Sequence, residues 1–275
     1  MNRLDLGPIG VSLEVSDDDT HLDAARELER LGYSALWLPG GQLDRLDRLT
    51  ELVGATTQVR IGSAIISPDV YGADEVTSWY AQLEVSAPGR VVVGLGGSQT
   101  PPALPALHEY LDRLDRDGAV PVERRLLAAL GPRKLEIARD RSAGALTLLV
   151  TPDYTRQARA ALGAEALLVV DQFVMLEDDP AKARETARAH LRFLAGVAGY
   201  RANFARMGFT DTEISTLGVR LVDELVAWGD ADAIAARVDA HRAAGADHVV
   251  LAVLADDDQP GTLEVARRLA PRASR

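Results

Sequence analysis

Two adjacent cations, Arg133 and Lys134, follow directly on Gly131-Pro132. By residue type and spacing they are the leading candidates for a chemical role. The apolar run before them, Leu126–Leu130, predicts a strand, and Pro132 suits the first position of a helix. Cations are disfavoured there, because the backbone dipole makes a helix N-terminus positive. A bound anion would remove the conflict, since free backbone N–H groups and both cations would converge on it. The turn is therefore a candidate phosphate site, and an ordinary helix start with solvated cations is the alternative.

The elements that must position this turn alternate between amphipathic helices and apolar strands. Three segments, ERLGYSALWL, RAALGAEALLVV and HRAAGADHVVLAVL, pass from a helix through a glycine into a strand. Continuous apolar strands in such an alternation indicate a parallel sheet buried on both faces. The expected strands are Ile9–Val15, Tyr33–Leu38, Val59–Ile66, Val91–Leu95, Leu126–Leu130, Ala145–Val150, Leu167–Leu176 and His248–Leu254.

Eight such units match a closed (β/α)8 TIM barrel, and we expect one domain over residues 1–275. An open doubly wound sheet is the rival, but its Gly-rich dinucleotide fingerprint is absent after the first strand. We expect Leu221–Ala227, which precedes the last helix–strand unit, to be helical.

Composition narrows the class of protein. Lys+Arg 30 against Asp+Glu 41 gives a net charge of -11, which argues against nucleic acid or an anionic membrane as the main partner. The absence of cysteine excludes disulfides and thiolate metal sites. No histidine pair stands at metal-ligand spacing near carboxylates, so we expect no metal and interpret the five histidines as structural or surface residues. Without a signal peptide or a spanning apolar run, we expect a cytoplasmic protein.

In a TIM barrel, ligands bind at the carboxyl ends of the strands. Small residues dominate those positions here, including Gly40-Gly41 and Gly96-Gly97-Ser98. Small residues let the backbone approach a flat ligand closely, as a ring-bearing cofactor requires. An enzyme that relied on its own acids and bases would place more His, Asp and Glu there.

A few polar side chains fall at the same ends. Glu14, at the end of the first strand, is either an acid–base or substrate-binding group or a solvated strand end. Gln99 either hydrogen-bonds a cofactor or substrate or is an exposed loop residue. The seventh strand also carries Asp171 and Gln172.

Several segments, in order along the chain, resemble the luciferase-like monooxygenase family in its coenzyme F420-dependent oxidoreductase branch. They include LERLGYSALWLPGG, VRIGSAII, GRVVVGLGGSQ, AALGPRKLEIARDRSAGALTLLVTPDYTRQAR and NFARMGFTD. The resemblance implies a TIM barrel that holds F420, or alternatively FMN, at its mouth. It also implies a non-proline cis peptide behind the ring and a phosphate at the fifth turn. The implied cofactor-binding residues are Ser63, Ala64, Ile65, Gly96, Gly97, Ser98, Ala129, Leu130, Gly131, Pro132, Arg133 and Lys134.

The implied activity is hydride transfer between the deazaflavin and a small organic substrate, with Glu14 and Gln99 as the catalytic candidates. Barrels of the family commonly pair through helices, which makes a homodimer one candidate assembly and leaves the oligomeric state open. The chain departs from the family where Pro39-Gly40-Gly41 replaces the usual acid and histidine, and where Thr147-Leu148 replaces a His-Pro pair. Two alternatives therefore stand beside the main interpretation: an FMN-dependent monooxygenase or reductase, and a degenerate barrel that binds cofactor without turnover.

Overall fold

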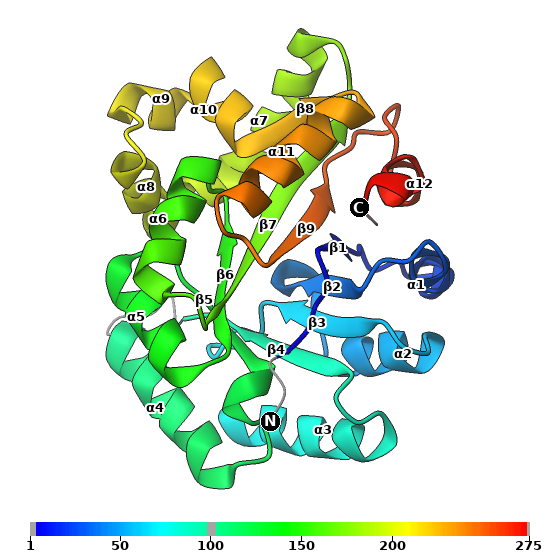
Figure 1. The fold of residues 1–275 in the computed structure, drawn as a ribbon, viewed down its shortest axis with the longest axis vertical. Coiled ribbons are helices and arrows are strands. Elements are labelled where there is room, and N and C mark those ends of the chain that lie inside the picture. The colour runs from blue at the N-terminus through cyan, green and yellow to red at the C-terminus, as the bar shows by residue number, and fades with distance from the viewer. Residues whose placement is uncertain (1–3, 98–102, 274–275) are drawn as a thin grey trace.

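Parallel strands close into a barrel in the order β1-β2-β3-β4-β5-β6-β7-β9, and β9 pairs with β1 (Figure 1). The structure is a computed structural model that describes residues 4–97 and 103–273. The predicted (β/α)8 barrel is thereby confirmed. The barrel strands are β1 (Ile9–Ser12), β2 (Ala35–Pro39), β3 (Arg60–Ala64), β4 (Val91–Leu95), β5 (Arg125–Ala128), β6 (Gly144–Leu148), β7 (Leu167–Leu176) and β9 (His248–Val253).

Helices surround the barrel, and several begin as their sequences predict. Pro132 occupies the first turn of its helix, and the Thr151 hydroxyl accepts a hydrogen bond from the Tyr154 amide to cap the next. No described helix is long and apolar enough to cross a membrane. The helices are α1 (Thr20–Arg30), α2 (Asp47–Ala55), α3 (Ala73–Ser86), α4 (Ala103–Asp117), α5 (Pro132–Arg141), α6 (Pro152–Leu162), α7 (Pro180–Gly196), α8 (Ala198–Arg206), α9 (Asp211–Thr216), α10 (Val219–Leu225), α11 (Ala231–Ala243) and α12 (Thr262–Ala273), with short 3-10 helices η1 (Gly40–Gln42) and η2 (Val122–Arg124).

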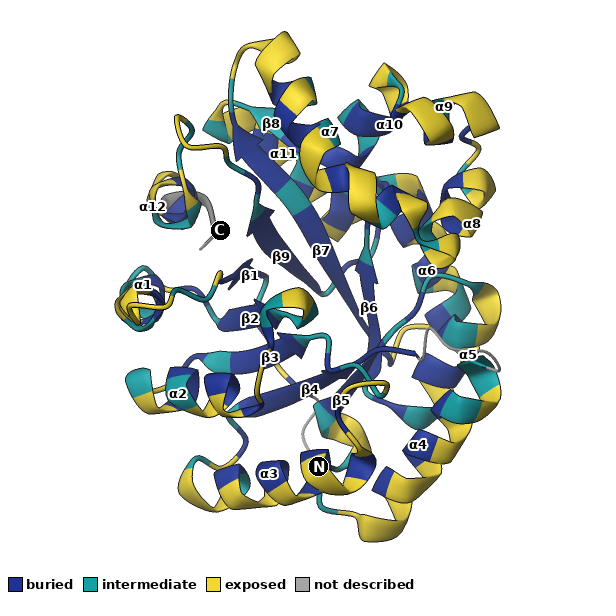
Figure 2. Cartoon of the chain, turned by 180° about the vertical axis from the view of Figure 1, so that it is seen from behind, coloured by how far each residue is buried: buried dark blue, intermediate teal, exposed yellow. Residues whose placement is uncertain are grey.

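The strands are buried on both faces, as their apolar sequences predict (Figure 2). Alternate residues of β7 show the division between the two faces. Leu167 and Val169 belong to the core inside the barrel, with Trp37 of β2, whereas Leu168 and Val170 belong to the core under the helices. The period-two alternation of a strand therefore sets which side chains can reach the barrel mouth.

The expected helix over Leu221–Ala227 is wrong at its end. Helix α10 stops at Leu225, and β8 (Val226–Gly229) pairs with the second half of β7. The reason lies in the length of β7, because pairing with β6 ends at Asp171 and leaves the backbone of Phe173–Leu176 without a partner on that side. Strand β8 satisfies those groups. It also anchors the segment α7–α10, which packs around a core of its own.

Candidate functional site

A pocket of about 680 Å³ opens at the carboxyl ends of the central barrel strands. Its walls come from β3, β5, β6 and β7, from the turn after β4, from the first turn of α5 and from α8. This position matches the mouth at which TIM barrels bind ligands. The turn at α5 therefore lines this pocket and is not an isolated surface loop.

Small residues and a cis peptide form one wall of the pocket. The Ala64–Ile65 peptide is cis, within the segment for which the resemblance implied such a bond, and both residues line the pocket. A Cβ added to Gly96 would lie 2.4 Å from Ile65 Cδ1, and one added to Gly97 would lie 2.6 Å from Lys134 Nζ. A side chain at Gly96 or Gly97 would therefore require Ile65 or Lys134 to move.

Ser63 supports this wall from behind. Its side chain is fully buried, its hydroxyl donates to the Gly94 carbonyl at 2.9 Å, and it accepts from the Gly94 amide at 2.9 Å. Ser63 is not among the pocket-lining residues, so it positions the neighbouring backbone instead.

The opposite wall is the turn predicted as a phosphate site. Ala129, Leu130, Gly131, Pro132, Arg133 and Lys134 all line the pocket, and the structure brings them together with Ala64, Ile65, Gly96 and Gly97. The Tyr154 hydroxyl donates a short hydrogen bond to the Leu130 carbonyl and holds the turn in place. Burial lowers the pKa of Lys134, whose amine lies against Gly97.

A third cation, which the sequence analysis did not single out, reaches the same turn. Arg206 of α8 lines the pocket, and its Nη2 lies 3.5 Å from the position of a Cβ on Gly131. Asn203 orients it by accepting a 2.8 Å hydrogen bond from its Nη1. The only sequence signal was its place in the segment NFARMGFTD. No described acidic side chain forms an ion pair with Arg133, Lys134 or Arg206.

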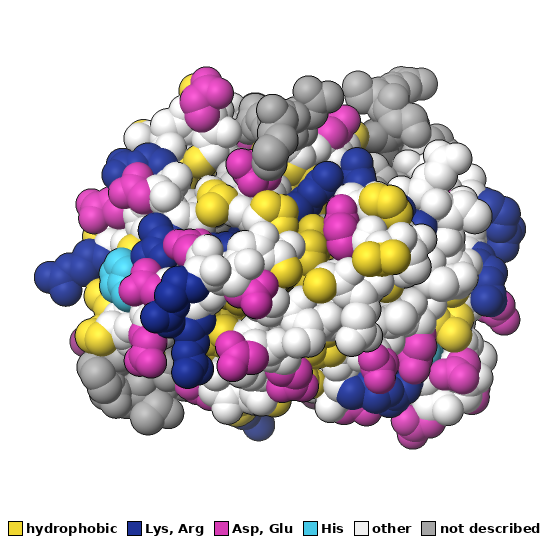
Figure 3. Space-filling view, turned by 90° about the horizontal axis from the view of Figure 1, so that it is seen from below, with side chains coloured by type: hydrophobic (Ala, Val, Ile, Leu, Met, Phe, Trp, Pro, Cys, Tyr) yellow, Lys and Arg dark blue, Asp and Glu magenta, His cyan; other side chains and the backbone are white. Residues whose placement is uncertain are grey.

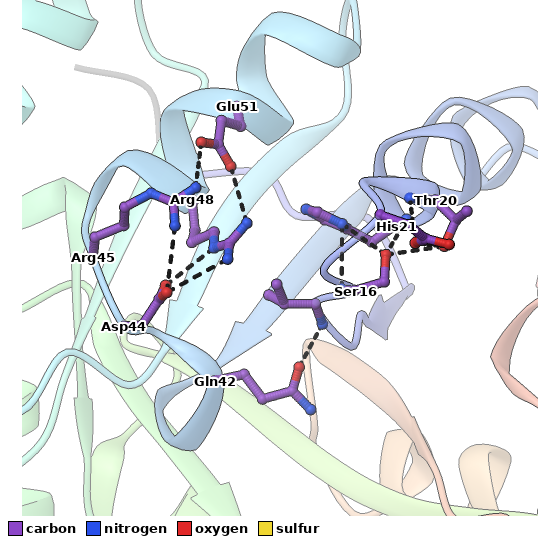
Figure 4. A network of polar contacts seen from close by, with 10 residues as sticks. Ser16, Thr20, His21, Gln42, Asp44, Arg45, Arg48 and Glu51 are labelled. Carbon is purple, nitrogen blue, oxygen red and sulfur yellow. Dashed lines mark hydrogen bonds and ion pairs between the residues drawn. The ribbon is translucent and has the colours of Figure 1, made fainter.

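Charged groups elsewhere are arranged differently. Near the ends of β1 and β2, Arg48 binds Asp44 at 3.0 Å and Arg45 binds Glu51 at 2.7 Å (Figure 4). Acidic and basic side chains are likewise interspersed over the face drawn in Figure 3. The cations beside β1 and β2 thus have acidic partners, whereas Arg133, Lys134 and Arg206 form no described ion pair.

Of the two predicted catalytic residues, only Glu14 lies in the described part of the chain, and it does not line the pocket. Glu14 is exposed and is absent from the pocket lining, and the next amide, Val15, donates to Gln42 Oε1 at 2.5 Å (Figure 4). Gln99, together with the predicted cofactor residue Ser98, lies outside the described residues. Their predicted roles stay predictions.

Asp171 is the titratable residue that does line the pocket from a strand. It continues the inward-facing row of Leu167 and Val169 on β7, it is 8% exposed, and its Oδ1 has no hydrogen-bond partner. Burial raises the pKa of its carboxyl to about 7. Tyr200 of α8 lines the same pocket, and burial together with the charge of Asp171 raises its pKa to about 12.

The two most deeply placed histidines have structural partners. Trp37 Nε1 donates to His248 Nε2 at 3.1 Å, and the other ring nitrogen of His248 lies 2.8 Å from the Gly7 carbonyl. His241 lies between Thr155 and Gln172, at 2.8 Å from each side-chain oxygen. The described part of the chain contains no group of three or more His, Cys, Asp or Glu residues that could hold a metal ion.

Residues 10–117 match the family model described as luciferase-like monooxygenase. This part of the chain is similar to that family. The matched part runs from β1 to the end of α4 and includes the cis peptide and the glycine wall. Comparison with curated proteins gave no match.

Solved structures share the fold of this chain over nearly its whole length. An F420-dependent secondary alcohol dehydrogenase with an F420–acetone adduct is 18% identical, with a TM-score of 0.66 and coverage of 98% of this chain and 99% of that one. The coenzyme F420-dependent tetrahydromethanopterin reductase of Methanopyrus kandleri is 16% identical, with a TM-score of 0.72 and coverage of 96% and 97%. The oxygenating constituent of 3,6-diketocamphane monooxygenase from Pseudomonas putida, in complex with FMN, is 12% identical, with a TM-score of 0.62 and coverage of 98% and 99%.

Proposed function

We propose that this luciferase-like protein is an oxidoreductase that binds coenzyme F420 and exchanges a hydride between it and a small organic substrate. The observation that carries the proposal is the convergence of Arg133, Lys134 and Arg206 on one end of a pocket whose other wall is made of small residues. A ligand with an anionic tail and a flat ring complements that division of the pocket.

The residues present fit such a cofactor. The three cations and the first backbone N–H groups of α5 would hold the phosphate end, because together they supply charge and donors and none of the three cations forms a described ion pair. Ala64, Ile65 and the Gly96-Gly97 backbone would lie along the ring. When bound, the cofactor supplies the hydride chemistry, and the protein supplies position, exclusion of water and a proton.

FMN is the alternative cofactor, because it also joins a phosphate to a flat ring. Structures with this fold include two F420-dependent enzymes and a monooxygenase in complex with FMN. The choice of F420 rests on the resemblance of the sequence segments to the F420-dependent branch. Glu14 and Gln99 as catalytic residues, and pairing as a homodimer, remain predictions attached to this proposal.

The test is a pair of fluorescence titrations of the purified protein, one with F420 and one with FMN. We expect saturable binding of F420 that weakens as salt rises, since the contacts with the phosphate are ionic. Preference for FMN would move the assignment to a flavin-dependent monooxygenase or reductase. Binding of neither would overturn the proposal. Binding without substrate-dependent bleaching of the cofactor absorbance, across a panel of alcohols and ketones, would favour the barrel that binds without turnover.

A further inference from the structure

Asp171 lines the pocket, and its carboxyl oxygen Oδ1 has no hydrogen-bond partner in the protein. The strand residues that line the pocket are Ala64, Ala128, Leu146, Leu148 and Asp171, and only the last has an ionisable side chain. Its strand neighbours offer no counterion, because the register pairs it with Leu148 of β6 and Val250 of β9. A buried carboxyl oxygen without a partner is costly unless it is protonated or meets a ligand.

The charged and titratable groups around Asp171 come from two other elements. Tyr200 and Arg206 stand on α8, and Arg133 and Lys134 on α5, all of them lining the same pocket. None of the three cations forms an ion pair with Asp171 among the described contacts. Burial is the sole cause of its raised pKa, so the carboxyl exchanges a proton near neutral pH.

Tyr200 adds a second donor on the same side of the pocket. With a pKa of about 12 it keeps its proton at neutral pH. Its ring is stacked against Phe204 with a centroid separation of 6.4 Å, which fixes its direction. A phenol and a protonated carboxyl that share an apolar pocket can both donate to one ligand oxygen, a pairing known from other enzymes that stabilise an oxyanion.

We propose that Asp171 is the acid–base residue of this pocket and that it exchanges a proton with the oxygen of a ketone or secondary alcohol held beside Tyr200. The inference rests on the proposed function and deepens it, because it names the substrate class and the proton donor. It also supplies the acid that is missing after β2, where Pro39-Gly40-Gly41 stands.

The proton balance is complete with a reduced deazaflavin or flavin as the hydride source. In the reductive direction a hydride reaches the carbonyl carbon, the C=O π bond breaks, and the oxygen takes the proton of the Asp171 carboxyl. The carboxylate that remains is reprotonated from solvent. In the oxidative direction the Asp171 carboxylate accepts the hydroxyl proton while the carbon loses a hydride to the oxidised cofactor.

The experiment compares the wild type with Asp171→Asn, Tyr200→Phe and Asp223→Asn. The last is a matched control, since Asp223 pairs with Arg184 outside this pocket. Infrared difference spectra of the free proteins between acid and alkaline pH follow the carboxyl C=O band. We expect a band that titrates near pH 7 in the wild type, in Tyr200→Phe and in Asp223→Asn, and that is missing in Asp171→Asn.

Folding and stability give a second readout that needs no substrate. Asp171→Asn keeps the shape of the side chain and removes only its ionisation. Because the folded pKa of about 7 exceeds the ordinary aspartate pKa of 3.8, the stability that protonated Asp171 contributes is present below pH 3.8 and is lost as pH rises through 7. In urea unfolding, the stability of Asp171→Asn relative to the wild type should therefore rise between those pH values and then stay level.

Turnover of the cofactor-loaded protein with a panel of ketones and secondary alcohols completes the test. We expect kcat of Asp171→Asn to fall about 100-fold or more, the typical contribution of general acid–base catalysis. The limb of its pH–rate profile near pH 7 should disappear, while its F420 affinity and the turnover of Asp223→Asn stay unchanged. Tyr200→Phe should slow turnover and keep the limb.

The outcomes separate the two proposals. If the wild type binds F420 and turns over these substrates, but Asp171→Asn keeps its kcat and pH limb, the assignment of Asp171 is overturned alone. A carboxyl band that survives in Asp171→Asn, or that titrates in the ordinary carboxyl range, overturns it as well. If the wild type binds neither F420 nor FMN, the proposed function fails, and with it the reaction in which Asp171 would act.

Discussion

The two halves of the barrel mouth treat their polar groups in opposite ways. Near the ends of β1 and β2, Arg48 and Asp44 satisfy each other, and the Val15 amide finds the side chain of Gln42 (Figure 4). Beside the ends of β5 and β6, the half-buried Lys134 and the buried Asp171 line one pocket and have no described ion-pair partner.

The difference between the two halves indicates which of them binds a ligand. A charge that is paired inside the protein has already exchanged its water for a partner, so it contributes to the fold and little to binding. A buried charge without a partner keeps its desolvation cost until a ligand arrives, so its interaction free energy is available for binding. The positions of the unpaired groups, rather than the number of charges, therefore mark the binding half of the mouth.

The largest effect is expected when all three pocket cations are removed. In Arg133→Ala/Lys134→Ala/Arg206→Ala we expect F420 affinity to fall about 100-fold or more, since a hydrogen bond to a charged group contributes about 1.5–3 kcal/mol. The dependence of affinity on salt should flatten as well. Fluorescence titration at several salt concentrations measures both.

The matched control removes paired cations from the other half. Arg45→Ala/Arg48→Ala should leave the F420 affinity and its salt dependence unchanged, because both side chains bind acids of the fold. Equal losses in the two variants would mean that net charge, and not the pocket, governs binding.

A smaller loss is expected when the glycine wall is filled. In Gly96→Ala the new Cβ meets Ile65 Cδ1 at 2.4 Å, and overpacking of this kind costs about 1–3 kcal/mol. If the side chain yields toward the ring site, F420 affinity should fall about 10-fold. Gly41→Ala is the control, since a Cβ there meets nothing within 4 Å. Unaltered binding by Gly96→Ala would show that the ring lies elsewhere.

Alkaline pH should weaken binding more gently. The pKa of Lys134 is lowered from 10.5 by burial, so its charge is lost at a lower pH than that of an exposed lysine, whereas Arg133 and Arg206 remain charged. As pH rises, the F420 affinity of the wild type should therefore begin to decline before pH 10.5 is reached. In Lys134→Arg the decline should vanish. A decline that persists in this variant would have to come from another group.

The smallest effect is expected in the half of the mouth near β1 and β2. Gln42→Ala removes the acceptor of the Val15 amide, and the loss of one such hydrogen bond costs about 1 kcal/mol of unfolding free energy. Urea unfolding should detect that change, while the F420 titration should not differ from the wild type. A clear loss of affinity would place the β1–β2 half of the mouth in contact with the cofactor.

The fold was readable from the sequence because apolar strands alternate with amphipathic helices throughout the barrel. The exception was Val226–Gly229, a four-residue strand directly after a helix, whose pairing depends on the length of β7. No local pattern reports that a distant strand has unpaired backbone beyond Asp171.

The site was readable only where one short segment carries it. Gly131-Pro132-Arg133-Lys134 combines its turn, helix start and cations in consecutive residues, so local rules were sufficient. Arg206 reaches the same turn from α8. Asp171 became a candidate only because the structure shows that its buried Oδ1 has no hydrogen-bond partner. Both facts depend on tertiary packing, which single-sequence periodicity does not encode.

The long strand β7 has a further consequence for how this protein can change its ligand. The chain leaves β7 at Leu176, builds α7–α10, and returns at Val226 to pair with the same strand. The barrel is closed independently, by β9 against β1 and β7. The segment α7–α10 is therefore an insertion that the barrel does not need for closure. We expect that changes in α8 alter which ligands bind without disrupting the barrel that carries Asp171.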